Sequence, residues 1–405
     1  MGKRSRSQRE KLRRRRQHMR QAGMALVALV CICALTFIGY AIFAPEREPQ
    51  SAYYLEDQQS EVLAPPFVVE NEVRDSTLTD EEIERMFAPD PQPTVPPMDS
   101  ATFTLTAVGD CTLGGVNGSN VNKRFQEAVA KYGVDYFFDN VRSIFEEDDI
   151  TLVNFEGVLT TATKKRPERP FNFKGSPEYV GIVAGSSVEV CTLANNHAYD
   201  YLQQGFDDTV ARLEENDIQV CGFGLSCVEN VRGVNVGFLG FTEWDYTQAQ
   251  IVKEVEAMRE NCDVLVVSMH WGSEKRYSTT DNQRRLAHAV VDAGADLVIG
   301  HHPHVVGEIE NYKGVQIVYS LGNFCFSGND HPYDTDAIIY QQTFVMGSDG
   351  VGSVSAKLYP ISVSTSSVIN DFHPVLLTGE DATRVLKKIA QNSDEEGLAL
   401  VEAVQ

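Results

Sequence analysis

Eight side chains of the types that bind metal ions or transfer protons follow apolar stretches of this sequence. They are two carboxylates, an amide and five imidazoles, namely Asp110, Glu156, Asn196, His197, His270, His301, His302 and His304. Carboxylate oxygen, amide oxygen and imidazole nitrogen together form the ligand set of hydrolytic Zn²⁺, Mn²⁺ or Fe sites, in which two ions activate a water and stabilise an oxyanion. The sequence therefore predicts a hydrolytic site with divalent metal, Mn, Zn or Fe.

The run GHHPH at positions 300–304 is the most specific of these features, because three imidazoles in four residues rarely serve packing. The other residues have structural alternatives: Asp110 could cap a turn, Glu156 could be a solvated loop residue, and His270 could be a core histidine. We favour the metal-binding interpretation because all of them follow strands in order. Three histidines without this placement are assigned structural roles: His288, His331 and His373.

The elements that must position these residues alternate between strands and helices. The predicted strands are Thr102–Val108, Ile150–Phe155, Val188–Ala194, Val234–Phe241, Val264–Met269, Leu297–Ile299 and Val315–Ser320. The predicted helices between them are Asn120–Lys131, Pro177–Ala184, Phe206–Asn216, Ile251–Glu260 and Asn282–Ala293. This alternation predicts an α/β domain, in which ligands bind at the carboxyl ends of the strands. Two later segments, Ala337–Met346 and Gly352–Tyr359, predict antiparallel strands, and a closing helix is expected at Asp381–Gln391.

The charge of the chain excludes nucleic acid as a partner. The net charge is −22 although residues 1–20 are strongly basic, so the remainder is still more acidic than the whole. Phosphate backbones are bound by clustered positive charge, and the body of this chain lacks it. The composition, with 42% hydrophobic residues, is that of a globular protein.

The N-terminus predicts a membrane anchor. A basic tail at residues 1–21 precedes an uncharged apolar run at 22–44, which as a helix would span about 34 Å and cross a bilayer. The basic flank stays in the cytoplasm, which places the C-terminal domain outside the cell. A cleaved signal peptide is the alternative, but its apolar region is normally shorter and Pro45 fits a cleavage site badly. Residues 45–100 form a proline-rich acidic linker, ordered at most in a short helix at Asp80–Met86 with Thr79 as N-cap.

Seven segments in matching order resemble the CapA/PgsA family of poly-γ-glutamate capsule biosynthesis proteins. They are AVGDCTLGG, NFEGVLT, FNFKGSPEYV, TLANNHAYDY, SMHWGSE, GADLVIGHHPHVVGEIE and VYSLGNFCF, within residues 101–345. This family is similar to the calcineurin-like metallophosphoesterases, so the resemblance implies a four-layer αββα sandwich, which we place at residues 101–365. Apart from the resemblance, we expect a helical extension at residues 366–405. It also implies a membrane-anchored member of a polymer synthesis and export assembly.

The resemblance implies a role for each motif residue. Asp110 is the metal ligand of the first motif, but Cys111 and Thr112 stand where the phosphoesterases have a following His. Glu156 takes the place of a bridging Asp. The remaining implied roles are metal binding for Asn196, His270, His302 and His304, and protonation of the leaving oxygen for His197, with His301 the doubtful member of its run. One metal ion, two ions with a substituted ligand, and a site that only binds all remain open.

Substrate contacts are predicted beside these motifs. The basic segment Lys164-Lys165-Arg166, with Arg169 and Lys174 behind it, could meet an anionic polymer or a phosphate, because local charge steers ligands more than net charge does. Trp271 could supply a stacking wall and His301 a polar contact. The alternative for the basic segment is a solvated loop that balances its acidic neighbours.

Three functions remain open from the sequence. The first is a capsule-biosynthesis protein with a metal-dependent hydrolase site for an anionic substrate. The second is a non-catalytic subunit that binds the polymer and holds the synthase at the membrane, and the third is an envelope phosphodiesterase unconnected with polyglutamate. Cysteine spacing does not discriminate between them. Six cysteines lie outside the anchor without a CxxC pair, and we assign no disulfide.

Overall fold

The computed structural model describes residues 78–87, 101–348 and 350–404. The predicted basic tail, the apolar run and most of the linker lie outside these residues, so the membrane anchor stays a prediction. Within the described part of the chain, no helix is both long and apolar enough to cross a bilayer.

The first sheet contains nine strands in the described residues and joins parallel and antiparallel pairs. Its main path runs β16 (Val375–Leu376), β15 (Gly350–Ser362), β14 (Asp336–Gly347), β1 (Thr102–Thr112), β2 (Ile150–Phe155), β5 (Val190–Thr192) and β6 (Gln219–Cys221). Two further strands lie off this path: β13 (Asn323–Phe326) pairs with β1, and β17 (Val401–Ala403) pairs with β15. The strands β1, β2, β5 and β6 are mutually parallel, whereas β14 to β16 are antiparallel.

The second sheet has a parallel centre and antiparallel edges. Its order is β11 (Ile309–Tyr312), β12 (Val315–Val318), β10 (Leu297–His301), β9 (Val264–His270), β8 (Val234–Thr242) and β7 (Cys227–Val231). Only the edge strands β7 and β11 run antiparallel to their neighbours. A separate short parallel pair, β3 (Val158–Leu159) with β4 (Lys174–Gly175), lies in the loop region after β2.

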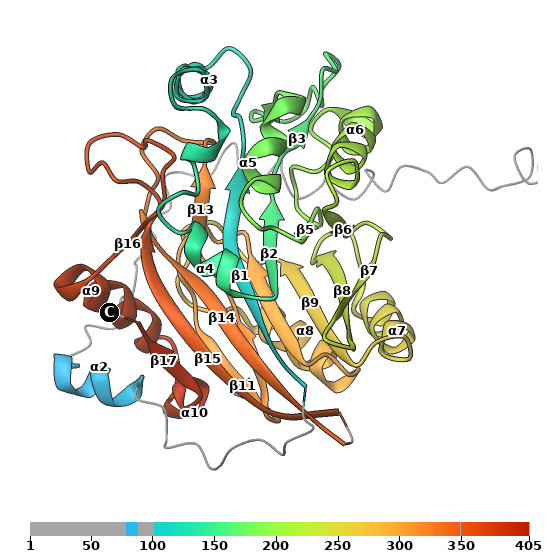
Figure 1. Cartoon of the computed structure of the whole chain (residues 1–405), viewed down its shortest axis with the longest axis vertical. Helices are drawn as coiled ribbons and strands as arrows, with labels where there is room; N and C mark the ends of the chain where they lie inside the picture. The colour runs from blue at the N-terminus through green and yellow to red at the C-terminus, as the bar shows by residue number, and fades with distance from the viewer. Residues whose placement is uncertain (1–77, 88–100, 349, 405) are drawn as a thin grey trace, which may run out of the picture. The chain divides into compact units, whose positions relative to one another are not determined.

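The two sheets pack face to face, with helices on both outer faces (Figure 1). Apolar residues of both sheets, such as Leu105 and Leu152 from the first and Val266 and Ile299 from the second, fill the core between them. The outer face of the first sheet is covered by α3 (Asn120–Tyr132), η2 (Val134–Tyr136), α4 (Arg142–Glu147), η3 (Pro177–Tyr179), α5 (Val180–Ala184) and α6 (Leu202–Glu214). The outer face of the second is covered by α7 (Gln248–Arg259) and α8 (Asp281–Asp292). The mixed α/β fold is confirmed.

Segments from both ends of the described chain complete the core between the sheets. The predicted helix at Asp80–Met86 is α2, with Thr79 and Glu82 forming a capping box, and both Ile83 on the helix and its C-cap Phe87 are buried. Helix α2 packs against α9 (Gly379–Ala390), which precedes α10 (Glu395–Leu398). Strands β16 and β17 belong to the first sheet, so the residues described between 366 and 404 contain strands of this sheet beside the helices α9 and α10.

Candidate metal centre

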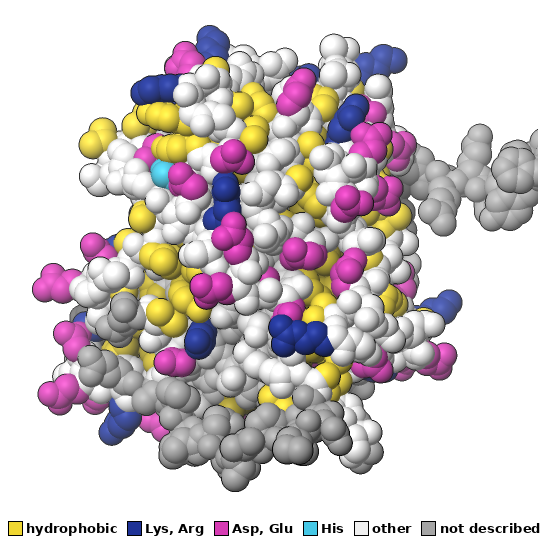
Figure 2. Space-filling model, in the orientation of Figure 1, with side chains coloured by type: hydrophobic (Ala, Val, Ile, Leu, Met, Phe, Trp, Pro, Cys, Tyr) yellow, Lys and Arg dark blue, Asp and Glu magenta, His cyan; other side chains and the backbone are white. Residues whose placement is uncertain are grey.

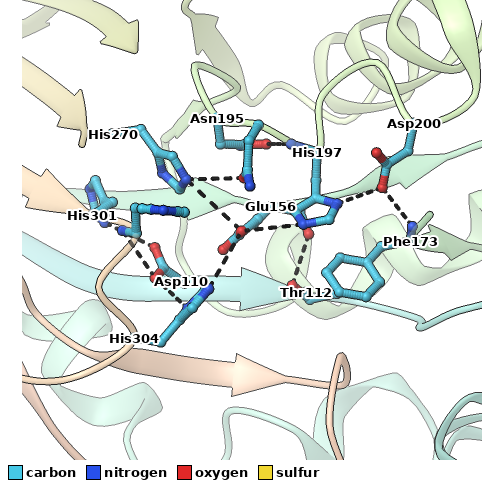
Figure 3. Close-up of polar contacts among 12 residues, drawn as sticks. Asp110, Thr112, Glu156, Phe173, Asn195, His197, Asp200, His270, His301 and His304 are labelled. Carbon is cyan, nitrogen blue, oxygen red and sulfur yellow. Dashed lines mark hydrogen bonds and ion pairs between the residues drawn. The ribbon is translucent and has the colours of Figure 1, made fainter. Parts of the chain in front are cut away.

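The predicted metal-binding residues meet where the carboxyl ends of the central parallel strands of both sheets converge. Asp110 lies near the end of β1, Glu156 directly follows β2, and His197 lies in the turn after β5. From the second sheet, His270 ends β9 and His301 ends β10. Figure 3 shows their side chains directed toward one another from these elements. The packing of the two sheets therefore brings together residues that are up to 194 positions apart, from Asp110 to His304.

Asp110 is fully buried and held at both carboxylate oxygens. Asn154 Nδ2 donates to Oδ1 at 2.7 Å, while Oδ2 lies 2.9 Å from His304 Nδ1 and accepts a hydrogen bond from the backbone N of His302 at 3.3 Å. The preceding Gly109 lets β13 approach closely, because a Cβ there would lie 2.0 Å from the carbonyl oxygen of Gly322. The carboxylate is therefore presented to the site in one orientation.

Glu156 is fully buried, and neither of its carboxylate oxygens has a hydrogen-bond partner among the described residues. Its Oε1 lies 3.9 Å from His197 Nε2, 4.0 Å from His270 Nε2 and 3.9 Å from His304 Nε2 (Figure 3). Native proteins rarely leave a buried carboxylate without hydrogen bonds, because desolvating its charge is costly. This carboxylate therefore stands among three imidazoles, and both of its oxygens are available to a cation.

Two groups of candidate metal ligands share Glu156. In the first, one ligand atom each from Asp110, Glu156 and His304 lies within 4.8 Å of the others. In the second, His270 Nε2 lies 3.2 Å from Asn196 Oδ1 and 4.0 Å from Glu156 Oε1. Oxygen and imidazole ligands at these separations fit a divalent cation such as Mn²⁺, Zn²⁺ or Fe²⁺. The two buried oxygens of Glu156, which accept no hydrogen bond from the described residues, are suited to contact such a cation.

The three histidines after β10 have different surroundings. The ring of His304 contacts Asp110 and Glu156, and its Nδ1 also lies 2.9 Å from Asn323 Oδ1. The ring of His302 lies beside His270, with ring centroids 4.8 Å apart. His301 is buried with its Nδ1 3.5 Å from Asp110 Oδ1, so it faces Asp110 rather than a substrate. His302 and His304 adopt positive φ angles of 96° and 57°, a strained backbone that is typical of functional sites.

Opposite charges and burial shift the pKa values of the site in different directions. Burial, and then the charge of Asp110, raise the pKa of Glu156 well above its usual range. Burial acts in the same direction on Asp110, but the imidazoles of His301 and His304 outweigh it and hold the pKa of Asp110 well below its usual value. Burial would lower the pKa of His304, but the carboxylates of Glu156 and Asp110 raise it to about 10.

The neighbouring imidazoles shift the other way. Burial, with the nearby His302, lowers the pKa of His270 well below its usual value. Burial, with the nearby His304, lowers the pKa of His302 to about 3. Neutral imidazoles are the form that binds metal ions, so His270 and His302 are ready to act as ligands at neutral pH.

His197 is held separately from the metal-ligand groups. Its Nδ1 lies 2.6 Å from Asp200 Oδ2, and its ring stacks on Phe173 with centroids 4.1 Å apart. Its other nitrogen, Nε2, is directed toward Glu156 at 3.9 Å. His197 therefore presents one nitrogen to the site and buries the other.

Four residues at the site were not identified from the sequence. Asn154 donates to Asp110, and Asn323 contacts His304 through both its amide atoms. Asp200 holds His197, and Trp244, which is 37% exposed, places its ring edge-on against His302 at 4.8 Å. A polar residue inside an apolar strand was a usable signal for Asn154, but nothing in the sequence indicated Trp244 rather than Trp271.

The predicted substrate contacts are only partly found at the site. The prediction for Trp271 is wrong: its ring is fully buried in the outer core beneath α8, and its Nε1 donates to the carbonyl oxygen of Tyr319 at 3.0 Å. Arg169 reaches the site, because its guanidinium donates to the backbone oxygen of Asn196. Lys174 Nζ donates to the carbonyl oxygen of Ala162 at 2.9 Å, within its own loop.

Comparisons with known proteins agree with this arrangement of motifs. The family model described as bacterial capsule synthesis protein PGA_cap matches residues 104–328. The capsule biosynthesis protein CapA of Bacillus anthracis is 33% identical over 257 residues, which cover 56% of this chain and 61% of that protein. The PGA biosynthesis protein CapA of Bacillus subtilis (strain 168) is 32% identical over 259 residues, which cover 58% of this chain and 66% of that protein. The match thus spans less than two thirds of either relative.

Among solved structures, a hypothetical protein from Thermus thermophilus aligns with 64% of this chain and 99% of its own, at 14% identity and a TM-score of 0.41. The family model covers more than half of the chain, and its matched range contains every residue of the candidate metal centre. The chain therefore belongs to the bacterial capsule synthesis protein family PGA_cap.

Proposed function

We propose that this chain is a membrane-anchored, metal-dependent hydrolase that acts on an anionic substrate during capsule synthesis. The observation that carries the proposal is the carboxylate of Glu156, which is fully buried, has no hydrogen-bond partner among the described residues and lies within 4.0 Å of three imidazole nitrogens. A buried charge is stable when it is paired or bound to a metal ion. A divalent cation is the partner that the surrounding ligand set fits.

The ligands form two groups that share Glu156, as in a two-metal site of the metallophosphoesterase type. Asp110 and His304 would hold one cation with Glu156, whereas Asn196 and His270 would hold a second, with His302 beside them. Divalent cations at these positions would supply positive charge where an oxyanion develops during hydrolysis. Asp110 and His270 are in turn oriented by Asn154, which supports the ligands as an outer shell does in known metal sites.

The role of the general acid falls to His197. Its Nε2 is directed toward Glu156 and the centre of the site, while its Nδ1 is occupied by Asp200. A protonated imidazole in this position can give its Nε2 proton to a leaving oxygen. The stacked ring of Phe173 on its face limits its rotation.

Local positive charge offers a route for an anionic substrate to an otherwise acidic protein. Figure 2 shows acidic side chains spread over the face that it draws, in keeping with the net charge of −22. Lys164 and Lys165 are exposed in the loop that also carries Arg169, which contacts the backbone at Asn196. This loop would attract a polyanion to the metal centre, because clusters of one sign steer ligands of the other. Poly-γ-glutamate or a phosphate-bearing precursor fits this charge, with synthase and export subunits as partners.

The test compares wild-type protein with Glu156→Gln, using the full chain purified in detergent. Bound Mn, Zn and Fe are measured by mass spectrometry after dialysis against each ion, and turnover is measured on bis(p-nitrophenyl) phosphate, p-nitrophenyl phosphate and poly-γ-glutamate. Glu189→Gln is the matched control. Glu189 is a half-buried carboxylate that lies directly before β5, away from the metal centre, and accepts a hydrogen bond from the backbone N of Thr151.

We expect wild type and Glu189→Gln to retain metal and hydrolyse at least one substrate, and Glu156→Gln to lose both properties. Equal metal content in wild type and Glu156→Gln would refute the metal centre. Stoichiometric metal without turnover of any of the three substrates would refute the hydrolase and support the polymer-binding subunit instead. Turnover of phosphodiesters alone would favour an envelope phosphodiesterase.

A further inference from the structure

Trp244 is a partly exposed indole beside the metal centre. It follows the end of β8 by two residues and is 37% exposed. Its ring is nearly perpendicular to the ring of His302, with centroids 4.8 Å apart, and its centroid lies 6.0 Å from that of His270. An aromatic side chain buries a large apolar area when a ligand covers it. Trp244 is therefore placed to contact a substrate that occupies the metal centre.

The backbone on both sides of Trp244 is held by hydrogen bonds. Thr242 Oγ1 donates to Asp245 Oδ2 at 2.6 Å and accepts from the backbone N of Asp245 at 3.0 Å. Before Trp244 in the chain, Glu243 Oε1 accepts a hydrogen bond from the backbone N of Gly272 at 2.8 Å. The loop is thus ordered before a ligand arrives, which reduces the entropy that is lost when a ligand binds to the indole.

Arg169 supplies positive charge on the same half of the metal centre. Its guanidinium donates to the backbone oxygen of Asn196, and Asn196 Oδ1 lies 3.2 Å from His270 Nε2. Arg169 belongs to the loop between β3 and β4, whereas Trp244 follows a strand of the second sheet. The two side chains therefore reach the surroundings of His270 from different parts of the fold. A guanidinium is a planar group of several donors, which matches the oxygens of a carboxylate or a phosphate.

We propose that Trp244 and Arg169 form a substrate-binding subsite for an anionic group attached to a flat unit, such as an aromatic ring or an amide plane. Arg169 binds the anion, and the indole of Trp244 covers the flat unit, so Trp244 determines specificity. This inference rests on the proposed function, because it takes the metal centre to be a substrate site. Carboxylates and phosphates share the chemistry that the guanidinium recognises, and the experiment separates them.

The test measures binding and does not depend on turnover. The full chain in detergent is titrated by calorimetry, with and without Zn²⁺, using two pairs of anions that differ in the flat unit. The phosphonates are phenylphosphonate and methylphosphonate, which are not hydrolysed, and the carboxylates are hippurate and acetate. We expect the flat member of at least one pair to bind wild type about 10-fold more tightly than its partner.

The variants separate the indole from a general effect of aromatic surface. Trp244→Leu should abolish the preference for the flat anion, whereas Trp244→Phe should keep it. Tyr132→Leu is the matched control, because Tyr132 is a 50% exposed aromatic residue on α3 that stacks on Tyr136, outside the metal centre. Equal affinities within both pairs in wild type, or an unchanged preference in Trp244→Leu, would overturn the inference.

Arg169→Gln tests the contact to the anion. It should weaken both members of the preferred pair by the same factor, about 10- to 100-fold, because each loses a hydrogen bond between charged groups. Arg212→Gln is the matched control, since Arg212 is an exposed arginine of α6 that pairs with Glu215 at 2.7 Å. Unchanged affinities in Arg169→Gln would refute its role in the subsite.

The two pairs of anions also identify the source of the charge. A preference confined to hippurate over acetate would assign the subsite to carboxylates on peptide units, and one confined to the phosphonates would assign it to phosphate-bearing substrates. If wild type binds no Zn²⁺, the proposed function fails. A preference that Trp244→Leu removes would still establish the subsite, so the two failures are distinguishable.

Discussion

Asn154→Leu removes the amide that orients Asp110 while keeping the same branched arrangement of side-chain heavy atoms. Asn154 is fully buried, donates to Asp110 Oδ1 at 2.7 Å and accepts from Asn195 Nδ2 at 3.2 Å. The lost hydrogen bond to the charged Asp110 contributes about 1.5–3 kcal/mol to stability. The lost bond from Asn195 costs less, because Asn195 Nδ2 still donates to the carbonyl oxygen of Phe155 at 2.8 Å. We therefore expect Asn154→Leu to lower the free energy of unfolding by about 2 kcal/mol.

The same substitution should weaken metal binding without abolishing it. Asp110 Oδ2 remains held by His304 Nδ1 and by the backbone N of His302, so only one of the two carboxylate oxygens is released. Loss of such an outer-shell contact lowers metal affinity by about 10- to 100-fold.

The assays are urea denaturation of the metal-free protein and Mn²⁺ titration by calorimetry. Asn122→Leu is the matched control: Asn122 is a buried asparagine on α3 that accepts from the backbone N of Gly115 and contacts no carboxylate of the site. The control should lose stability and keep its Mn²⁺ affinity. The same Mn²⁺ affinity in Asn154→Leu as in wild type would refute the reasoning.

Phe87 is 3% exposed in the core, so Phe87→Ala should destabilise the docked α2 by about 3 kcal/mol and speed amide hydrogen exchange at Ile83 about 100-fold. Glu81→Ala, on the exposed face of α2, should leave this exchange unchanged, and equal exchange rates in both variants would contradict the docking of α2. Burial raises the pKa of Glu189 to about 7, so its ionisation opposes folding and stability is lost as pH rises from about 4.5 through 7. In urea denaturation, Glu189→Gln should therefore be more stable than wild type by about 1 kcal/mol at pH 8, a figure reduced for the partial exposure of Glu189, and no more stable at pH 4.5. A gain in stability that does not change with pH would contradict the ionisation of Glu189 as its cause. Mn²⁺ should quench the fluorescence of Trp244, which contacts His302, and spare that of the buried Trp271; quenching that persists undiminished in Trp244→Phe would place the ion elsewhere.

Much of the architecture was predictable because the spacing of apolar residues and the residues that cap helices are local features of the sequence. The predicted strand Ile150–Phe155 is β2, and the predicted N-cap Thr79 begins α2. The strand predicted at Val188–Ala194 is shorter in the structure, Val190–Thr192, because the polar turn that carries His197 begins earlier. The strands β16 and β17, which lie beyond the boundary predicted at residue 365, were not predicted because a strand of two or three residues has too few residues for a recognisable pattern.

The sequence by itself determined which residue types stand at the carboxyl ends of the strands, and hence the class of site, because that placement follows from hydrophobic pattern and motif order. Only the tertiary structure decided how they combine: Glu156 is shared by two groups of ligands, His301 turns toward Asp110, and Asp200 holds His197. It also decided that Trp244 lines the site while Trp271 packs in the core. These outcomes depend on the packing of two sheets whose contributions to the site lie up to 194 residues apart, and no local pattern encodes the distance between them.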